Sequence, residues 1–328
     1  MKELFTFTVS ELGSLSGEPL PESGLELTRA ATLRNAHPSS IIFATALSTE
    51  RLQLLTRAHD CLLLLPTAEA DSLPATIRSA NVIAWVANPR LSYARIMNVV
   101  AANLVRPGRL ECRGGAWIST DADIADDVLI EPGAFIDHSV SICSGTRIST
   151  GAIIRAYSHI GPDSVVRDGA AVGVFGFAYE RDERGVPVPI PHFGGVHTGR
   201  GADIGSFSTI CAGTIDPTLL GDNVKVDSLV HIAHNCEIGD NTLVIACAEV
   251  SGSVRIGCNC WIGPNASVIE GHSIGDGSVI GLGAAVLKDV DPLTTVAGNP
   301  ALSTRLVSRR NRALSALVEA YYADRQPE

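Results

Sequence analysis

The stretch "VHIAHNCEIGDNTLVIACAEVSGSVRIG", residues 230–257, decides how this chain folds. Aliphatic residues recur in it at every sixth position, at Ile232, Ile238, Val244, Val250 and Ile256. A helix would repeat its apolar residues about every 3.6 positions and a half-buried strand every 2, so neither pattern fits. Small and turn-forming residues fill the intervals. The stretch therefore indicates a regular coil with a six-residue unit.

The same six-residue period extends in both directions from this stretch. It is interrupted at 175–198 and re-phased by a small insertion after residue 210. The aliphatic positions are Ile124, Ile130, Ile136, Ile142, Ile148, Ile154, Ile160, Val166 and Val172, then Ile204 and Ile210, then Leu220, Val226, Ile232, Ile238, Val244, Val250, Ile256, Ile262, Val268, Ile274, Ile280 and Val286. Internal repeats on this scale indicate a solenoid.

A triangular coil explains the period. Three short strands in each 18-residue turn place one aliphatic side chain per face on the axis, and runs such as "IGDNTL" bend the corners. Successive turns then pair as parallel strands about 4.8 Å apart, so about nine turns give a prism about 40 Å long. The pattern resembles the hexapeptide left-handed parallel β-helix, an exception to the usual right-handed crossover.

Two regions lie outside the period. Residues 1–108 mix helical and strand-like segments and predict a separate α/β domain, which precedes a β-helix domain over 109–300. The interruption at 175–198 is charged and then proline-rich, which favours a loop or hairpin leaving the prism. In the last segment, 301–328, Leu314, Leu317, Val318 and Tyr321 have helical spacing. We expect this helix to cover the open sheet edge.

Composition narrows the class of protein. Hydrophobic residues make up 45% of the 328 residues, yet no stretch reaches the ~18 apolar residues of a membrane span and no signal peptide is recognisable. We expect a cytoplasmic protein. The net charge of -10 and the 5% aromatic content argue against a nucleic-acid binder. The eight cysteines are scattered, without a zinc spacing, and predict buried free thiols.

The coil also contains residue types suited to acid–base chemistry. His234 stands two positions after the axial Ile232, so its side chain belongs at a corner. An imidazole with a pKa of about 6.5 can accept a proton from an amine or hydroxyl that attacks an acyl group. Two other interpretations remain open: His231 and His234 are a solvated pair on the β-helix surface, or they bind a metal in an oligomer.

A general base of this kind needs a partner that stabilises the developing oxyanion. Gly252, in "SGS", follows His234 by 18 residues, which is one turn of the coil. The two residues should therefore lie about 4.8 Å apart along the prism. A backbone N–H at this glycine turn is a suitable oxyanion donor.

The chain resembles UDP-3-O-(3-hydroxyacyl)glucosamine N-acyltransferase, the lipid A family often called LpxD, over nearly its whole length. The segments that carry the resemblance keep the family's order and spacing. They are "NPRLSYARI" (88–96), "FGFA" (175–178), "PIPHFGGV" (189–196), "VDSLVHIAHNCEIGDNTLV" (226–244), "SGSVRIG" (251–257) and "VIEGH" (268–272).

The resemblance implies a homotrimer in which acyl carrier protein delivers a hydroxyacyl thioester to the 2-amino group of a nucleotide-linked sugar. It implies that His234 is the catalytic base, that Gly252 donates its backbone N–H, and that His272 is a supporting histidine. The reaction needs no metal or redox cofactor. The resemblance also implies substrate-binding positions, at Phe43, Asn235, Phe175, Phe177 and His192.

The chain departs from the family pattern near the acceptor. The family's uracil segment, F-x-x-N-P-x-Y, corresponds to "FATALST", which keeps Phe43 but has Ala46 and Thr49 in place of Asn and Tyr. The family's "TIDRG" is replaced by "TICAG" at 209–213, and "DGFGF" by "GVFGF". These changes point to an altered acceptor, whereas the retained "HIAHN" favours acyl transfer.

The acyl donor has two candidates. "TTVAGNPA", residues 294–301, is similar to the end of coenzyme A dependent hexapeptide acetyltransferases and places Asn299 near a donor. Beyond it, four arginines lie within eight residues with no acid between them, as a solvated helix face or as a docking patch for carrier protein or coenzyme A phosphates: Arg305, Arg309, Arg310 and Arg312.

Three functional hypotheses follow. The first is an acyl-carrier-protein dependent N-acyltransferase of the lipid A pathway. The second is a coenzyme A dependent N-acyltransferase that acts on another nucleotide-linked amino sugar. The third is a metal-dependent, hydratase-like prism or a non-catalytic scaffold that uses His231 and His234.

Overall fold

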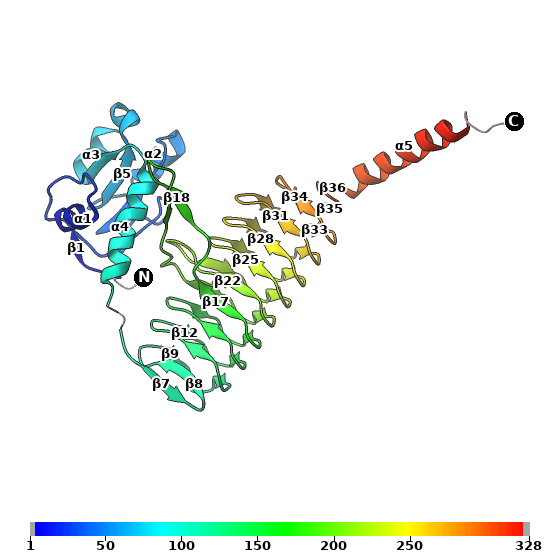
Figure 1. Cartoon of the computed structure of the whole chain (residues 1–328), viewed down its shortest axis with the longest axis horizontal. Helices are drawn as coiled ribbons and strands as arrows, with labels where there is room; N and C mark the ends of the chain where they lie inside the picture. The colour runs from blue at the N-terminus through cyan, green and yellow to red at the C-terminus, as the bar shows by residue number, and fades with distance from the viewer. Residues whose placement is uncertain (1–3, 106, 324–328) are drawn as a thin grey trace. The chain divides into compact units, whose positions relative to one another are not determined.

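The computed structural model describes residues 4–105 and 107–323, and it divides into two compact units (Figure 1). The N-terminal unit takes in the described residues up to Pro107 together with 177–194 and 214–216. The β-helix unit takes in 108–176, 195–213 and the described residues from Pro217 onward.

The N-terminal unit is an α/β structure built on a four-stranded parallel sheet in the order β3-β4-β5-β6. Ile42, Leu63 and Leu65 form the core on one side of this sheet with Leu55 and Ile77. The elements of the unit are β1 (Phe7–Thr8), α1 (Val9–Ser16), β2 (Glu26–Leu27), β3 (Arg29–Ala30), β4 (Ser40–Phe43), α2 (Thr49–Leu55), β5 (Leu62–Pro66), the 3-10 helix η1 (Thr67–Ser72), α3 (Ala75–Ala80), β6 (Val82–Val86), α4 (Pro89–Asn103), β18 (Tyr179–Arg181) and β19 (Pro187–Pro189).

Helix α4 begins where the sequence requires it. Asn88 is the N-cap, and its side chain accepts hydrogen bonds from the backbone N–H groups of Arg90 and Leu91, both at 3.1 Å. Pro89 occupies the first helical position, where its missing N–H costs nothing. Tyr93 and Met97 are fully buried, so α4 is a core element of the unit.

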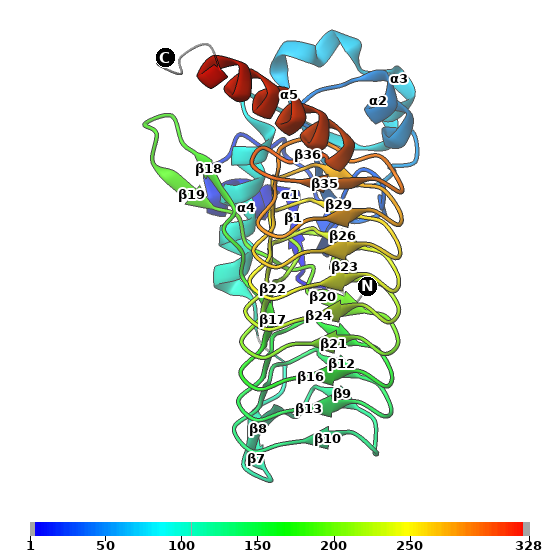
Figure 2. The same cartoon turned by 90° about the vertical axis from the view of Figure 1, so that its right-hand side faces the viewer.

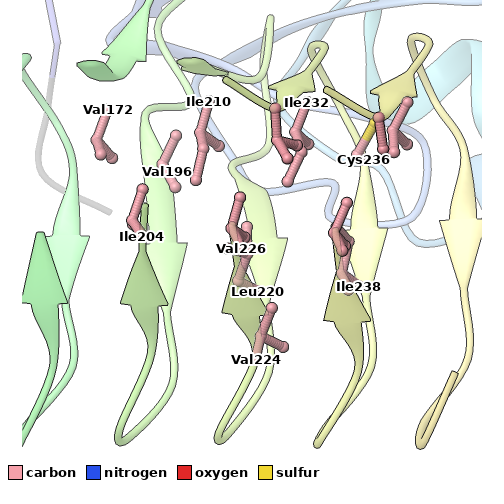
Figure 3. Close-up of a cluster of buried hydrophobic side chains, with 14 of the residues drawn as sticks. Val172, Val196, Ile204, Ile210, Leu220, Val224, Val226, Ile232, Cys236 and Ile238 are labelled. Carbon is pink, nitrogen blue, oxygen red and sulfur yellow. The ribbon is translucent and has the colours of Figure 1, made fainter. Parts of the chain in front are cut away.

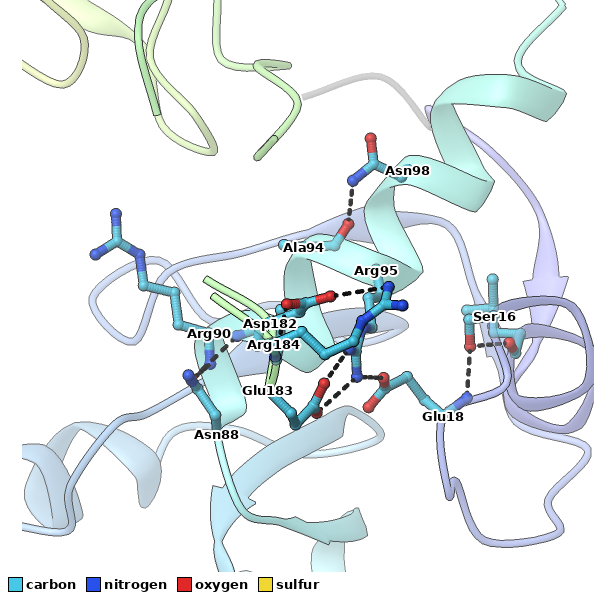
Figure 4. Close-up of polar contacts among 12 residues, drawn as sticks. Ser16, Glu18, Asn88, Arg90, Ala94, Arg95, Asn98, Asp182, Glu183 and Arg184 are labelled. Carbon is cyan, nitrogen blue, oxygen red and sulfur yellow. Dashed lines mark hydrogen bonds and ion pairs between the residues drawn. The ribbon is translucent and has the colours of Figure 1, made fainter. Parts of the chain in front are cut away.

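The β18–β19 hairpin belongs to the N-terminal unit and is held against α4 (Figure 4). Arg95 lies between two carboxylates, 3.1 Å from Glu18 and 2.7 Å from Glu183. The Asn98 side chain donates to the Pro189 carbonyl at 2.7 Å. The interrupted segment of the sequence therefore forms a hairpin that docks on the N-terminal unit instead of a further coil.

The β-helix unit has three faces, each a sheet of short strands, and Figures 1 and 2 show the coils stacked along it. All strand pairs are parallel except those made by β7 and β36, which lie at the ends. The first face is β7 (Leu110–Arg113), β8 (Ala116–Ser119), β11 (Phe135–Ile136), β14 (Ile153–Ile154), β17 (Ala171–Val174), β22 (Thr209–Cys211), β25 (His231–Ile232), β28 (Glu249–Val250), β31 (Ser267–Val268) and β34 (Ala285–Val286).

The other two faces follow the same order along the chain. The second face is β9 (Asp123–Ile124), β12 (Ser141–Ile142), β15 (His159–Ile160), β20 (Val196–Thr198), β23 (Thr218–Leu220), β26 (Glu237–Ile238), β29 (Arg255–Ile256) and β32 (Ser273–Ile274). The third is β10 (Leu129–Ile130), β13 (Arg147–Ile148), β16 (Val165–Val166), β21 (Asp203–Ile204), β24 (Lys225–Val226), β27 (Leu243–Val244), β30 (Trp261–Ile262), β33 (Val279–Ile280), β35 (Thr295–Ala297) and β36 (Leu302–Ser303).

The aliphatic residues predicted to lie on the axis form the core of this unit, as Figure 3 shows for the middle coils. Ile210, Ile232 and Val250 pair in register on successive coils of the first face and are fully buried. Ile124 and Ile130, in the first coil, are only partly buried because that coil has a neighbour on one side alone. The predicted β-helix is confirmed, and its hand is left.

Corners of the prism need a backbone conformation that few side chains tolerate. Asn223, Asn241 and Asn259 occupy one corner in successive coils, with φ of 56°, 57° and 57°. Asparagine is among the residues that adopt this left-handed conformation most readily. At the preceding position, the Asp240 carboxylate accepts a hydrogen bond from the Asp222 backbone N–H at 2.8 Å. The "GDN" at 221–223 and at 239–241 is thus a corner motif that also links adjacent coils.

The C-terminal helix α5 (Thr304–Ala323) is present as predicted, but its predicted role in covering the sheet edge is wrong. From Thr304 to Tyr322 every side chain is exposed except that of Val307, which is half-buried. The short strand β36 pairs with β35 at the edge instead. The helix therefore exposes both its charged and its apolar side chains.

Candidate functional site

The corner between β25 and β26 holds His234 against Gly252 of the next coil. His234 is 8% exposed. A Cβ atom added to Gly252 would lie 2.7 Å from Cε1 of the imidazole and 3.0 Å from Nε2, so the ring occupies the space that any side chain at 252 would need. The Ser253 backbone N–H donates to the His234 carbonyl at 2.9 Å, which fixes the two coils in register.

Asn235 follows in the left-handed conformation, with φ of 60°. Its side-chain amide lies 3.1 Å from Nδ1 of His234. The Asn235 backbone N–H donates to the Thr218 hydroxyl at 3.0 Å, and Thr218 is fully buried. The backbone of Asn235 is therefore anchored, and its side-chain amide contacts the imidazole. The structure thus brings together three of the predicted residues, His234, Asn235 and Gly252.

His272 lies one coil beyond Gly252 along the prism, and its partner was not foreseen from the sequence. Its Nδ1 is 3.0 Å from Oδ1 of Asp289. The Ser273 backbone N–H donates to the same carboxylate at 2.8 Å, and this bond, with the His272 contact, lowers the pKa of Asp289. Asp289 follows His272 by 17 residues, whereas a full coil of 18 residues leads to Val290, so the period alone did not identify this partner.

Ser251 and Glu249 were also missed, although they precede Gly252 directly. The Ser251 hydroxyl donates to the two carboxylate oxygens of Glu249, at 3.0 and 3.1 Å. Glu249 pairs in register with His231, which it follows by 18 residues. The coil length would have placed this acid beside His231.

Two buried thiols lie in this region of the first and second faces. Burial raises the pKa of Cys236 to about 12 and that of Cys211 to about 11, so both remain protonated thiols at neutral pH. The Cys236 thiol donates to the Ser251 carbonyl at 3.1 Å. These cysteines are packing residues rather than nucleophiles.

A metal site at His231 and His234 would need further ligands. Within residues 4–105 and 107–323, no three side chains of the His, Cys, Asp or Glu types gather as a metal ion requires. Zinc sites in proteins use three or four such ligands.

The other four predicted substrate-binding residues are divided between the two units. Phe43, at the end of β4, packs on the fully buried Tyr93 with ring centroids 4.8 Å apart. Phe177 is 87% exposed and contacts Tyr179. His192 is buried. These residues belong to the N-terminal unit, whereas Phe175, which is exposed, belongs to the β-helix unit.

The predicted donor-binding residues lie at the C-terminal end of the β-helix unit. Asn299 is exposed in the connection between β35 and β36. Arg305, Arg309 and Arg312 follow one another at helical spacing on α5, so they share one side of that helix, and Arg310 lies to the side of them. All four arginines are exposed.

A triangular prism of hexapeptide coils, with a corner imidazole packed on a glycine of the next coil, places the chain in the class of left-handed β-helix proteins built from hexapeptide repeats. The family model described as bacterial transferase hexapeptide (six repeats) matches residues 217–252 and 253–288. Those ranges contain both His234 and Gly252.

Curated relatives identify the family within that class. A UDP-3-O-acylglucosamine N-acyltransferase of Coxiella burnetii (strain RSA 493 / Nine Mile phase I) is 32% identical over 273 residues, 75% of this chain and 75% of the relative. One of Methylobacillus flagellatus is 29% identical, with 74% and 71% covered. The chain belongs to the UDP-3-O-acylglucosamine N-acyltransferase family, and it is an acyltransferase.

Solved structures agree on the fold. A UDP-N-acetylglucosamine acyltransferase from Campylobacter jejuni superimposes with a TM-score of 0.54 at 28% identity, over 66% of this chain and 86% of that one. LpxA from Acinetobacter baumannii gives a TM-score of 0.53 at 26% identity, over 61% and 76%. No helix among the described residues is both long and apolar enough to cross a bilayer.

Proposed function

We propose that this chain transfers a 3-hydroxyacyl group from acyl carrier protein to the 2-amino group of a UDP-3-O-acylglucosamine, a step of lipid A biosynthesis in the cytoplasm. The observation that carries the proposal is the His234 imidazole, buried and packed on Gly252, in a chain of this family. The reaction as written needs no bound cofactor.

His234 is the general base in this mechanism. The Asn235 amide nitrogen lies 3.1 Å from Nδ1 of His234. The proposed mechanism uses the flipped amide, whose oxygen faces the ring and accepts a hydrogen bond from a proton on Nδ1. Nε2 then has a lone pair that can accept a proton from the attacking nitrogen. The same nitrogen can afterwards return that proton to the leaving thiolate.

Gly252 stabilises the oxyanion of the tetrahedral intermediate. Among the described residues, no acceptor takes a hydrogen bond from its backbone N–H. A fixed N–H beside the general base can bind the negative charge that develops on the thioester oxygen. His272, hydrogen-bonded to Asp289, supports the site from the following coil.

The N-terminal unit binds the nucleotide of the acceptor in this proposal. Phe43 offers an aromatic ring whose position is fixed by Tyr93. Ala46 and Thr49 cannot stack on a base, so the contact with the base differs from the family pattern. The part of the acceptor other than the nucleotide is assigned to Phe175, Phe177 and His192.

The donor binds through the end of the β-helix unit. The arginines of α5 present positive charge in a chain of net charge -10, which suits the acidic surface of a carrier protein. The phosphates of an acyl-coenzyme A, together with Asn299, fit the same charges and make it the alternative donor.

The chain assembles as a homotrimer in this proposal. Along α5, Leu306, Leu314, Leu317 and Val318 form an exposed apolar stripe. On the third face, Leu243 is exposed and pairs in register with the half-buried Trp261. Exposed apolar surface of this extent is typical of protein contacts.

The test is mass spectrometric detection of the amide product. UDP-3-O-(3-hydroxyacyl)glucosamine is offered with 3-hydroxyacyl carrier protein and, separately, with acyl-coenzyme A. We expect product from the carrier protein, loss of at least about a hundredfold in rate for His234→Ala, and normal rates for His197→Ala, a histidine of the second face. Wild-type turnover by His234→Ala would exclude the mechanism, and product from acyl-coenzyme A alone would select the alternative donor.

A further inference from the structure

A single carboxylate lies in the row of outward residues on the first face that includes His231. The parallel registers place Thr209, His231, Glu249 and Ser267 side by side on successive coils. Continued to both ends of the described parallel strands, the row contains no other acid and no other imidazole; its remaining members are Trp117, Phe135, Ile153, Ala171 and Ala285.

Hydrogen bonds fix this carboxylate near the candidate active site. Ser251 donates to both oxygens of Glu249, at 3.0 and 3.1 Å. Ser251 directly precedes Gly252, on which the His234 ring packs. The Glu249 carboxylate is therefore hydrogen-bonded to the residue that precedes Gly252. Because Glu249 is half-buried, water screens its charge less than that of a fully exposed acid.

The negative charge of Glu249 also reaches the corner that carries His234. Cys236 comes two residues after His234, and its thiol donates to the carbonyl of Ser251. Burial is the main reason that the pKa of Cys236 is raised to about 12, and the charge of Glu249 raises it further. The charge of Glu249 is therefore close enough to act on a group at this corner.

That charge matters for an amine acceptor, and the argument here rests on the proposed function. An amino group with a pKa near 8 is largely a cationic ammonium at neutral pH. Overall, R–NH3+ and a thioester give an amide, a thiol and one proton: the C–N bond forms and the C–S bond breaks. One proton leaves the ammonium for water before attack, and His234 carries the second to the leaving thiolate.

We propose that Glu249, oriented by Ser251, binds the ammonium form of the acceptor's 2-amino group and so selects an amine over a hydroxyl acceptor. A carboxylate attracts the cation and accepts its hydrogen bond, whereas a neutral hydroxyl gains much less from the same group. Glu249 is then a specificity-determining residue that lies three residues before the glycine on which the general base packs.

The experiment measures acceptor binding by the full chain without any acyl donor. Calorimetric titration compares UDP-3-O-acylglucosamine with its 2-hydroxy analogue, UDP-3-O-acylglucose. We expect the wild type to bind the amine about tenfold more tightly, as one charge-assisted hydrogen bond allows. Glu249→Gln should remove this preference while leaving the affinity for the hydroxy analogue unchanged.

Glu237→Gln is the matched control, because Glu237 is an exposed outward residue of the neighbouring second face. It should keep the tenfold preference. Equal binding of the two acceptors by the wild type, or an undiminished preference in Glu249→Gln, would overturn the inference. Failure of the wild type to bind either nucleotide sugar would instead overturn the proposed function, so the two failures are distinguishable.

Discussion

Replacement of Gly252 by alanine tests whether the packing of His234 on this glycine is needed for activity. The added Cβ would lie 2.7 Å from Cε1 and 3.0 Å from Nε2 of His234. Gly252 does not have a positive φ, so alanine causes no backbone strain there. The perturbation is therefore confined to the contact between the new methyl group and the imidazole.

The expected magnitude follows from the geometry. Ordinary carbon contacts begin near 3.4 Å, so the ring must shift by about 0.7 Å or more. A displacement of about 1 Å at a catalytic group can lower the rate about a hundredfold. The overpacking should also lower the free energy of unfolding by about 1–3 kcal/mol.

The assay combines steady-state kcat with urea unfolding for Gly252→Ala and for its combination with His234→Ala. If the clash is with the imidazole, the double variant should be no less stable than His234→Ala alone. Gly24→Ala is the control, since a Cβ there meets no atom within 4 Å. A kcat of Gly252→Ala within threefold of wild type would refute the reasoning.

Three further predictions concern the rest of the chain. Removing the Arg95 side chain leaves the buried carboxylate of Glu18 without its cation. Arg95→Ala should therefore have a free energy of unfolding, measured in urea, about 2 kcal/mol lower than wild type. Trypsin should also cleave its β18–β19 hairpin faster, and equal cleavage rates would contradict the docking. Cys236 should react with a thiol reagent at pH 8 at least about a thousandfold more slowly than the exposed Cys112, because its pKa is about 12 and it is buried. The lowered pKa of Asp289 means that its contribution to stability is present above pH 4 and is lost as the pH falls through that lowered value. The difference in unfolding free energy between wild type and Asp289→Asn should therefore vanish at acidic pH. A difference that persists there would contradict the assignment.

Much of the β-helix unit was predictable because its sequence and its structure share one period. Ile232, Val250 and Val268 occupy equivalent positions, since each lies one coil from the next. The same period predicted that Gly252 would meet His234, and the structure has that contact. Contacts with a fixed sequence separation can be counted without coordinates.

Other contacts have no such fixed separation. Arg95 binds Glu183, 88 residues away, and Asn98 binds the carbonyl of Pro189, because a hairpin outside the period folds back on α4. The exposure of α5 likewise contradicted the expectation that it would cover the sheet edge.

The sequence by itself therefore determined the coil, its axial core and the pairing of His234 with Gly252, because a repeat converts residue number into position along an axis. Only the tertiary structure decided that Ser251 orients Glu249 and that Asp289 contacts His272, because side-chain rotamers and the shorter last coil are set by packing rather than by the period.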